Sequence, residues 1–180
     1  MSFRIEMEPY KTLGVRDPED TTVSEAIESV YRPGPAVRGP KIRIHLTRQT
    51  WVTVPVEGGV SDIYNDLVWM LKKLEQGVDP LEVRFLCSCF TAIWRFSESN
   101  GALTIRTSWT SVIGTSNGCE IRDAHFNNDV SQFVVNKKTF VAEWRRLLGR
   151  IKCDLLRAGY DSRLDNFEYL EQVGSERADK

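Results

Sequence analysis

Residues 82–110 read EVRFLCSCFTAIWRFSESNGALTIRTSWT and decide the fold, because polar and apolar side chains alternate through most of the stretch. Alternation with a period of two is typical of β-strands that bury one face. We predict three strands, at about residues 82–88, 91–97 and 102–109. Asn100-Gly101 separates the last two, and both residue types tolerate the positive φ angles of a type I′ hairpin turn. The stretch therefore predicts an antiparallel sheet.

Two helices flank this β region. Residues 61–76 carry one apolar stripe at helical spacing, with Ser61 as the candidate N-cap and Gly77 as the stop signal. Residues 137–158 carry a second and longer stripe, with Asn136 as the candidate cap. Both patterns predict amphipathic helices that pack an apolar face on the sheet.

Shorter segments complete the predicted fold. Further strands are expected at residues 3–7, 41–47, 51–56 and 131–135, and short helices at residues 23–31 and about 164–170. Thr22 and Glu25 have the spacing of a capping box at the start of the first short helix. The order of elements predicts the α+β class: a mostly antiparallel sheet with two main helices packed on one face, plus short N- and C-terminal helices.

Length and composition indicate one ordinary folded domain over residues 1–180. The chain has 41% hydrophobic and 27% charged residues and a net charge of −1, which excludes a disordered chain and argues against a dedicated, strongly basic nucleic-acid binder. We expect residues 1–40 to be an N-terminal elaboration that ends in a Pro/Gly-rich loop. Residues 41–173 would form the main body, and residues 174–180 a frayed tail. The chain shows neither an apolar run of membrane-spanning length nor a secretory signal, so we expect a cytoplasmic protein.

Four cysteines, at positions 87, 89, 119 and 153, are too few for a disulfide scaffold. We expect all four to be free thiols, mostly buried. On a strand, Cys87 and Cys89 would share one face and would not bond to each other.

Three patterns resemble catalytic or metal motifs, and we interpret each as a chance match. Residues 114–118 fit G-x-S-x-G, but no helical pattern follows Ser116, as the hydrolase motif requires. The two C-x-C cysteines with Cys119 and His125 lack the spacing of zinc knuckles. A cysteine–histidine dyad would need the fold to bring distant residues together. The sequence therefore predicts no catalytic residue, no cofactor and no metal ligand.

Charge is distributed unevenly along the chain. Residues 1–30 carry seven acids and three bases, residues 137–157 seven bases and two acids, and residues 161–180 six acids and three bases. The simplest interpretation is solvated helix faces or internal pairing between the basic helix and the acidic tail. The alternative is a charged docking face that steers a partner of opposite sign.

The polar segment 114–130 is long for a loop in a compact domain, and a loop of this length is often functional. A disordered loop or a missed strand pairing, with a short strand at 120–122, is the alternative. One of the hairpin tryptophans, Trp94 or Trp109, could be an exposed anchor for a partner, with core packing as the alternative. The candidate partner-binding residues are Asp123, His125, Asn127, Asn128, Asp129, Trp109, Asp161, Asp165 and Glu168.

Over residues 41–160 the pattern resembles immunity proteins of bacterial polymorphic toxin systems, including contact-dependent growth inhibition. The likeness lies in the capped helix from Ser61, the hairpin that joins Trp94-Arg95-Phe96 to Leu103-Thr104-Ile105, and the strand that runs into a long helix from Phe133. This resemblance implies a cytoplasmic, non-catalytic protein that binds one cognate toxin domain tightly. Many such proteins are acidic when the toxin is a nuclease, and the net charge of −1 departs from that pattern.

The expected partner is thus a protein toxin domain, with no direct contact to nucleic acid or membrane, and the protein itself a monomer or small homo-oligomer. Two other functions stay open. One is a small hydrolase or transferase whose site is assembled from dispersed residues. The other is an adaptor or structural subunit that uses an exposed sheet edge.

Overall fold

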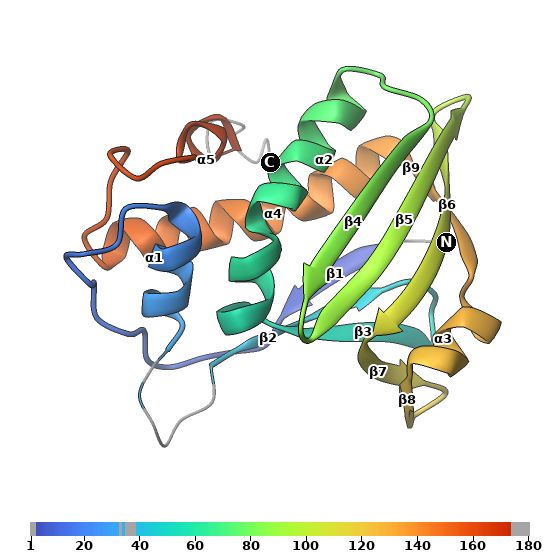
Figure 1. Ribbon diagram of the computed structural model, residues 1–180, viewed down its shortest axis with the longest axis horizontal. Coiled ribbons are helices and arrows are strands. Elements are labelled where there is room, and N and C mark those ends of the chain that lie inside the picture. Colours follow the sequence, from blue (N-terminus) through green and yellow to red (C-terminus); the bar gives the residue numbers. More distant parts are fainter. Residues whose placement is uncertain (1–2, 33, 35–38, 174–180) are drawn as a thin grey trace, which may run out of the picture.

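The computed structural model describes residues 3–32, 34 and 39–173 and has the predicted α+β architecture (Figure 1). The strands of that part form two antiparallel sheets, where the sequence predicted one. The first sheet has the order β1 (Arg4–Met7), β2 (Lys41–His45), β3 (Thr50–Pro55), β7 (Ile113–Ser116) and β8 (Cys119–Arg122). The second has the order β4 (Leu81–Cys87), β5 (Phe90–Ser99), β6 (Ala102–Ser111) and β9 (Gln132–Asn136).

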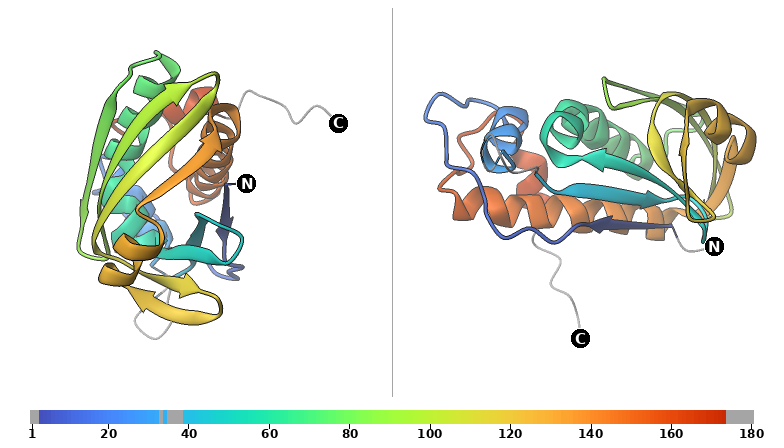
Figure 2. Two further views of the ribbon diagram at one scale, coloured as in Figure 1. Left: turned by 90° about the vertical axis from the view of Figure 1, so that its right-hand side faces the viewer. Right: turned by 90° about the horizontal axis from the view of Figure 1, so that it is seen from below.

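The helices are α1 (Val23–Val30), α2 (Ser61–Glu75), α3 (Asp123–Asp129), α4 (Lys137–Arg157) and α5 (Glu168–Val173), and an irregular turn, η1 (Val56–Val60), leads into α2. Figure 2 shows α4 running beside β1 along one side of the molecule, with α1 and α2 on the other side. α2 contacts β4, whereas α4 contacts β1. α4 also contacts β9, so it touches strands of both sheets.

The hairpin prediction is confirmed at Asn100-Gly101. Both residues have positive φ angles, 51° and 75°, and Ser99 pairs with Ala102 across the turn. Positive φ at two successive positions is the requirement of a type I′ turn. This turn joins β5 and β6 in an almost continuous register.

The two sheets are connected at Val112, where the chain leaves β6 and enters β7 after a single residue. The side chain of Asp123 accepts a hydrogen bond from the Val112 N–H at 2.7 Å and so supports this bend. Segment 114–130, which we considered as an irregular loop, instead forms β7, β8 and α3. The alternative of a missed strand pairing is therefore confirmed. Asn117-Gly118, with φ angles of 49° and 81°, makes the turn between β7 and β8.

The helix caps agree with the sequence in two of three cases. Thr22 and Glu25 form the predicted capping box of α1, and Asn136 Oδ1 accepts the Thr139 N–H at the start of α4. The prediction for Ser61 is wrong, because the backbone is already helical at the end of η1, before Ser61. Ser61 Oγ instead accepts the Gly58 N–H at 2.9 Å. Ser61 therefore closes the turn before the helix.

One hydrophobic core unites the described elements, and its centre is aromatic. Trp94 on β5 and Trp144 on α4 are both fully buried, with ring centroids 6.5 Å apart. Residues of β1 and α1 belong to the same core, so residues 3–30 pack with the rest of the chain. The proposed division at residue 40 stays a prediction. None of the described helices is long and apolar enough to cross a membrane.

Candidate partner-binding surfaces

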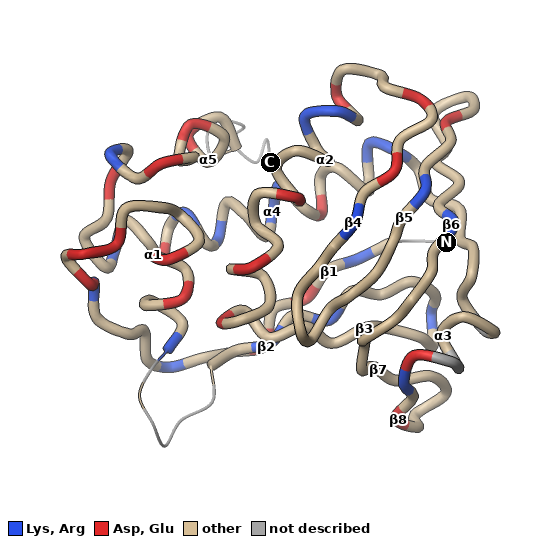
Figure 3. Tube along the Cα trace, in the orientation of Figure 1, with Lys and Arg blue, Asp and Glu red and all other residues tan. Residues whose placement is uncertain are grey.

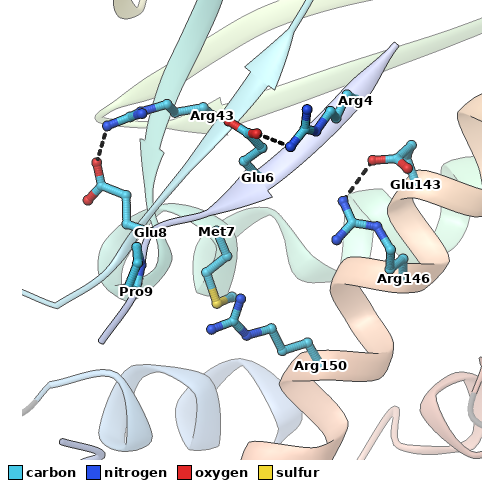
Figure 4. Close-up of a pocket in the computed structure, with 9 residues that line it drawn as sticks. All are labelled: Arg4, Glu6, Met7, Glu8, Pro9, Arg43, Glu143, Arg146 and Arg150. Carbon is cyan, nitrogen blue, oxygen red and sulfur yellow. Dashed lines mark hydrogen bonds and ion pairs between the residues drawn. The ribbon is translucent and has the colours of Figure 1, made fainter. Parts of the chain in front are cut away.

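A cleft of about 580 Å³ lies between β1 and α4, and its walls are mostly charged (Figure 4). It is lined by Arg4, Glu6, Met7, Glu8, Pro9, Arg43, Glu143, Arg146 and Arg150. Three of the four arginines pair with a glutamate of the same cleft: Arg4 with Glu6, Arg43 with Glu8, and Arg146 with Glu143. The charges of this cleft are therefore largely neutralised within it.

The pair on α4 also holds the edge of the first sheet. Ile5 donates its N–H to Glu143 at 2.7 Å, and its carbonyl accepts a hydrogen bond from Arg146. These backbone groups point away from β2, because an unpaired edge strand presents half of its polar groups outward. Burial acts to raise the pKa of Glu143, but the Arg146 guanidinium and the Ile5 N–H outweigh it and hold the pKa below its usual range. The cleft thus has a clear structural role.

We expect Glu143→Gln to lower the free energy of unfolding at pH 7 by about 1 kcal/mol, since a charge-assisted hydrogen bond and a screened ion pair are lost. The folded-state pKa of Glu143 is depressed, so its contribution is present above the ordinary value of 4.5 and disappears as pH falls through the folded-state pKa. Urea titrations at pH 7 and at pH 3 check this: the difference in stability between the variant and the wild type should be smaller at the second pH. Glu120→Gln, on the exposed β8, is the matched control. A deficit that persists unchanged at pH 3 would assign the loss to packing.

A second, smaller groove of about 390 Å³ lies between α1 and the start of α2, and it is acidic. It is lined by Asp17, Asp20, Ser24, Glu25, Glu28, Ser29, Arg32, Ser61 and Asp62. Five carboxylates from three separate segments thus face one guanidinium. Figure 3 shows acidic residues gathered along α1 and along the first half of α2. We call this surface the acidic groove.

Hydrogen bonds fix part of the acidic groove in place. Glu28 pairs with Arg32 and also accepts a hydrogen bond from Ser61 Oγ at 3.1 Å. Glu25 accepts the N–H groups of Thr21 and Thr22, both at 2.9 Å, and these bonds lower its pKa. Both side chains are therefore held in position by hydrogen bonds, which pre-forms this surface.

A further acid follows Asp62 on α2. Asp62 and Asp66 lie one helical turn apart, and like charges at this spacing destabilise a helix by about 0.2–0.5 kcal/mol. Burial raises the pKa of Asp66. This arrangement costs stability in the free protein, and a cation placed across it would offset that cost.

The structure separates the predicted partner-binding residues into two groups. Five of them, from Asp123 to Asp129, share helix α3, beside β8. Of the other three acids, Asp161 and Asp165 lie between α4 and α5 and Glu168 begins α5, and Figure 1 shows that segment at the opposite end of the molecule from α3. One compact partner site does not include both groups.

Within the first group, two side chains serve the fold. Asp123 supports the bend at Val112, and the Asn127 amide bonds both the N–H and the carbonyl of Trp109, each at 2.8 Å. Asn128 is exposed. The backbones of His125 and Asp129 lie in α3, while their side chains fall outside the described residues.

Core packing is confirmed for both hairpin tryptophans, so Trp109 is not an exposed partner-binding residue. Trp94 and Trp109 are 0% and 3% exposed, and Trp109 donates its indole N–H to the Val130 carbonyl at 3.0 Å. Both side chains are buried because they face inward from β5 and β6, and α3 and α4 cover that face of the sheet. Trp109 is therefore a core residue. The tryptophan with the more exposed ring is Trp69 on α2, at 44%.

In the second group, Asp161 forms an ion pair with Arg163. Hydrogen bonds from the side chain and the backbone N–H of Arg163 lower the pKa of Asp161 to about 2. Asp165 and Glu168 are exposed. The Asp165 backbone bonds Thr21 and Val23, directly beside the capping box of α1. This group therefore borders the acidic groove.

The charge count along the sequence identified the acidic N-terminal segment but did not predict that it lies beside Asp62. The distance between them in the chain hides this contact, since only the packing of α1 on α2 brings them together. A possible signal was Asp62 itself, in the first turn of a well-defined helix, where it points outward from the apolar stripe.

The other motifs resolve into structure. Ser116 lies in strand β7, and its hydroxyl is 3.0 Å from that of Thr50, so the strand–turn–helix geometry of a hydrolase nucleophile is not formed there. His45 bonds Glu6 at 3.0 Å. The expectation of mostly buried cysteines is wrong for Cys119 and Cys153, which are exposed because they face outward from β8 and α4. Among the described side chains, no three His, Cys, Asp or Glu residues are grouped to hold a metal ion.

No family model matches the chain, and no curated protein or solved structure matches it either.

Proposed function

We propose that the protein is a non-catalytic binding protein of the cytoplasm that neutralises a cognate toxin domain by tight stoichiometric binding, as immunity proteins do. The observation that carries this proposal is the acidic groove, where five carboxylates from separate segments face one arginine. Its complement is a basic protein surface.

Electrostatics supports such a role for the acidic groove. Carboxylates gathered on one surface create a local potential that attracts a basic partner and speeds its association. The net charge of −1 hides this potential, because the arginines and lysines of α4 balance the total from another part of the molecule. A nuclease toxin, which must carry a basic surface to hold its own substrate, fits this groove.

The direct test is co-expression with the product of the adjacent open reading frame in the source genome, followed by size-exclusion chromatography and calorimetry. We expect a one-to-one complex whose association rate falls steeply as salt is raised, since exposed charges are screened beyond about 10 Å at 0.1 M salt. A neighbouring product that forms no complex at micromolar concentrations contradicts the proposal.

Charge reversal locates the contact. Asp17→Lys and Asp62→Lys should each weaken the complex roughly tenfold, about 1.4 kcal/mol, because each places a cation against the basic partner. Glu120→Lys makes the same charge change on β8, away from the acidic groove, and should leave the affinity within about twofold. Circular dichroism confirms that each variant is folded. Equal losses for the groove variants and for Glu120→Lys would remove the acidic groove as the docking surface.

A further inference from the structure

Cys87 and Cys89 lie together at the turn between β4 and β5. Cys87 ends β4, Ser88-Cys89 forms the turn, and Phe90 starts β5 opposite Cys87. The two Sγ atoms are 3.0 Å apart. The sequence treated both cysteines as strand residues, which would not bond to each other. The turn changes this relation, because Cys89 leaves the strand and folds back over Cys87.

The same carbonyl oxygen lies close to both sulfur atoms. Gly58 O lies 3.3 Å from Cys87 Sγ and 3.2 Å from Cys89 Sγ. Gly58 has a φ of +63°, which a glycine adopts without strain, and its neighbour Gly59 leaves room for the thiols. A Cβ added at Gly59 would lie 3.2 Å from Cys89 Sγ. The η1 turn thus approaches the two sulfur atoms closely.

The two thiols differ in character. The Cys89 thiol donates to Cys87, the backbone N–H groups of Cys89 and Phe90 also point at it, and together they lower the pKa of Cys87 to about 7. The same hydrogen bond raises the pKa of Cys89. At pH 7, about half of Cys87 is therefore thiolate, and Cys89 is the protonated neighbour beside it. Cys87 is 3% exposed and Cys89 is half-buried, so a small reagent is the suitable reactant.

We propose that Cys87 and Cys89 form a reversible redox site that hydrogen peroxide converts to an intrachain disulfide. The Cys87 thiolate attacks one peroxide oxygen, the O–O bond breaks, and hydroxide leaves and takes up a proton as water. Cys87 is then a sulfenic acid. The Cys89 sulfur attacks Cys87 Sγ, the S–O bond breaks, and the Cys89 proton leaves with the oxygen as a second water. Two thiols are oxidised, one peroxide is reduced to two waters, and an external dithiol reverses the change by exchange.

The separation of the sulfur atoms supports ring closure. A disulfide bond is about 2.05 Å long, so the two Sγ atoms must approach by roughly 1 Å. Rotation of side chains in a two-residue turn supplies a movement of this size. Core packing alone does not require two sulfur atoms to contact each other and the same carbonyl oxygen.

Peptide mass analysis tests the proposal on the full-length protein. Trypsin cuts after Arg84 and Arg95, so one peptide, residues 85–95, carries both cysteines, while Cys119 and Cys153 fall on separate peptides. The reduced protein is treated with hydrogen peroxide at pH 7, alkylated and digested. We expect peptide 85–95 to lose two hydrogen atoms and to escape alkylation, while the Cys119 and Cys153 peptides remain alkylated. Dithiothreitol should restore alkylation of both residues.

Two controls make the result decisive. In urea-unfolded protein the reaction should be about tenfold slower at pH 7, since an ordinary thiol has far less thiolate at this pH. In Cys89→Ser the loss of two hydrogen atoms should vanish, and a 1,3-dione reagent should trap a sulfenic acid at Cys87. Cys119→Ser should behave as the wild type. The proposal is overturned if Cys87 and Cys89 stay alkylatable at peroxide levels that oxidise Cys119 and Cys153, or if unfolding leaves the rate unchanged.

Discussion

Trp94→Ala is expected to lower the free energy of unfolding by about 3–5 kcal/mol, the largest loss among the substitutions considered. Trp94 is fully buried, and its ring lies among seven aromatic neighbours. Their ring centroids lie 5.2–6.5 Å from that of Trp94, and the neighbours are Phe85, Phe90, Phe96, Trp109, Phe133, Phe140 and Trp144. Removing the indole leaves a cavity that rigid rings from both sides cannot fill.

Urea denaturation followed by circular dichroism measures this loss. Trp69→Ala is the matched control, because Trp69 is 44% exposed and should cost about 1 kcal/mol or less. Trp94→Phe adds a finer test. The Trp94 Nε1 has no hydrogen-bond partner among the described residues, so phenylalanine removes an unsatisfied donor together with part of the ring. The phenylalanine variant should therefore lose less than half of what Trp94→Ala loses. Equal stability of Trp94→Ala and Trp69→Ala would contradict the aromatic centre of the core.

Asp154→Ala should be the next most damaging change, at about 2–4 kcal/mol. Asp154 lies on α4, is 2% exposed, and accepts hydrogen bonds from two tyrosines: from the Tyr31 hydroxyl at 2.7 Å, and from that of Tyr10. Arg157 lies 3.5 Å from the other carboxylate oxygen. Loss of the carboxylate leaves the Tyr31 hydroxyl buried without its acceptor, and burial of an unsatisfied polar group is costly.

A double-mutant cycle with Tyr31→Phe separates this effect from simple loss of volume. If the hydrogen bond is the cause, Asp154→Ala should cost about 1–2 kcal/mol less in the Tyr31→Phe background than in the wild type. Glu171→Ala, in the exposed part of α5, controls for removal of an acid from this end of the molecule. Strictly additive losses in the cycle would contradict a coupled Asp154–Tyr31 pair.

The sequence predicted local elements well, because their signals are local. The ends of α1, α2 and α4 lie within one residue of their predicted positions, and Asn100-Gly101 marks its turn. The division into two sheets was not predictable in the same way. It depends on a bend at Val112, and a carboxylate eleven residues away supports that bend. Asn117-Gly118 was an available hairpin signal that the polar character of its surroundings concealed.

The surfaces were less predictable than the fold. Charge counting identified an acidic N-terminal segment but could not show which basic side chain pairs with which acid. Arg146 illustrates this point: its partner Glu143 is close to it in the sequence, whereas its partner Ile5 lies near the other end of the chain. The cysteine pair was missed for a geometric reason: we considered Cys87 and Cys89 on one strand face, whereas the tight turn at Ser88-Cys89 brings the Cys89 sulfur onto that of Cys87.

The contacts between the two ends of the chain affect its synthesis on the ribosome. Ile5 is bound by Glu143, which follows it by 138 residues, and Thr22 pairs with Asp165. At about 5–20 residues per second, the N-terminal strand waits roughly 7–30 s for these contacts. During that time the apolar side chains of the future α1 lack the part of their packing that α4 supplies. The seven acids of residues 1–30, four of which later line the acidic groove, keep the waiting segment charged and discourage its association with other nascent chains.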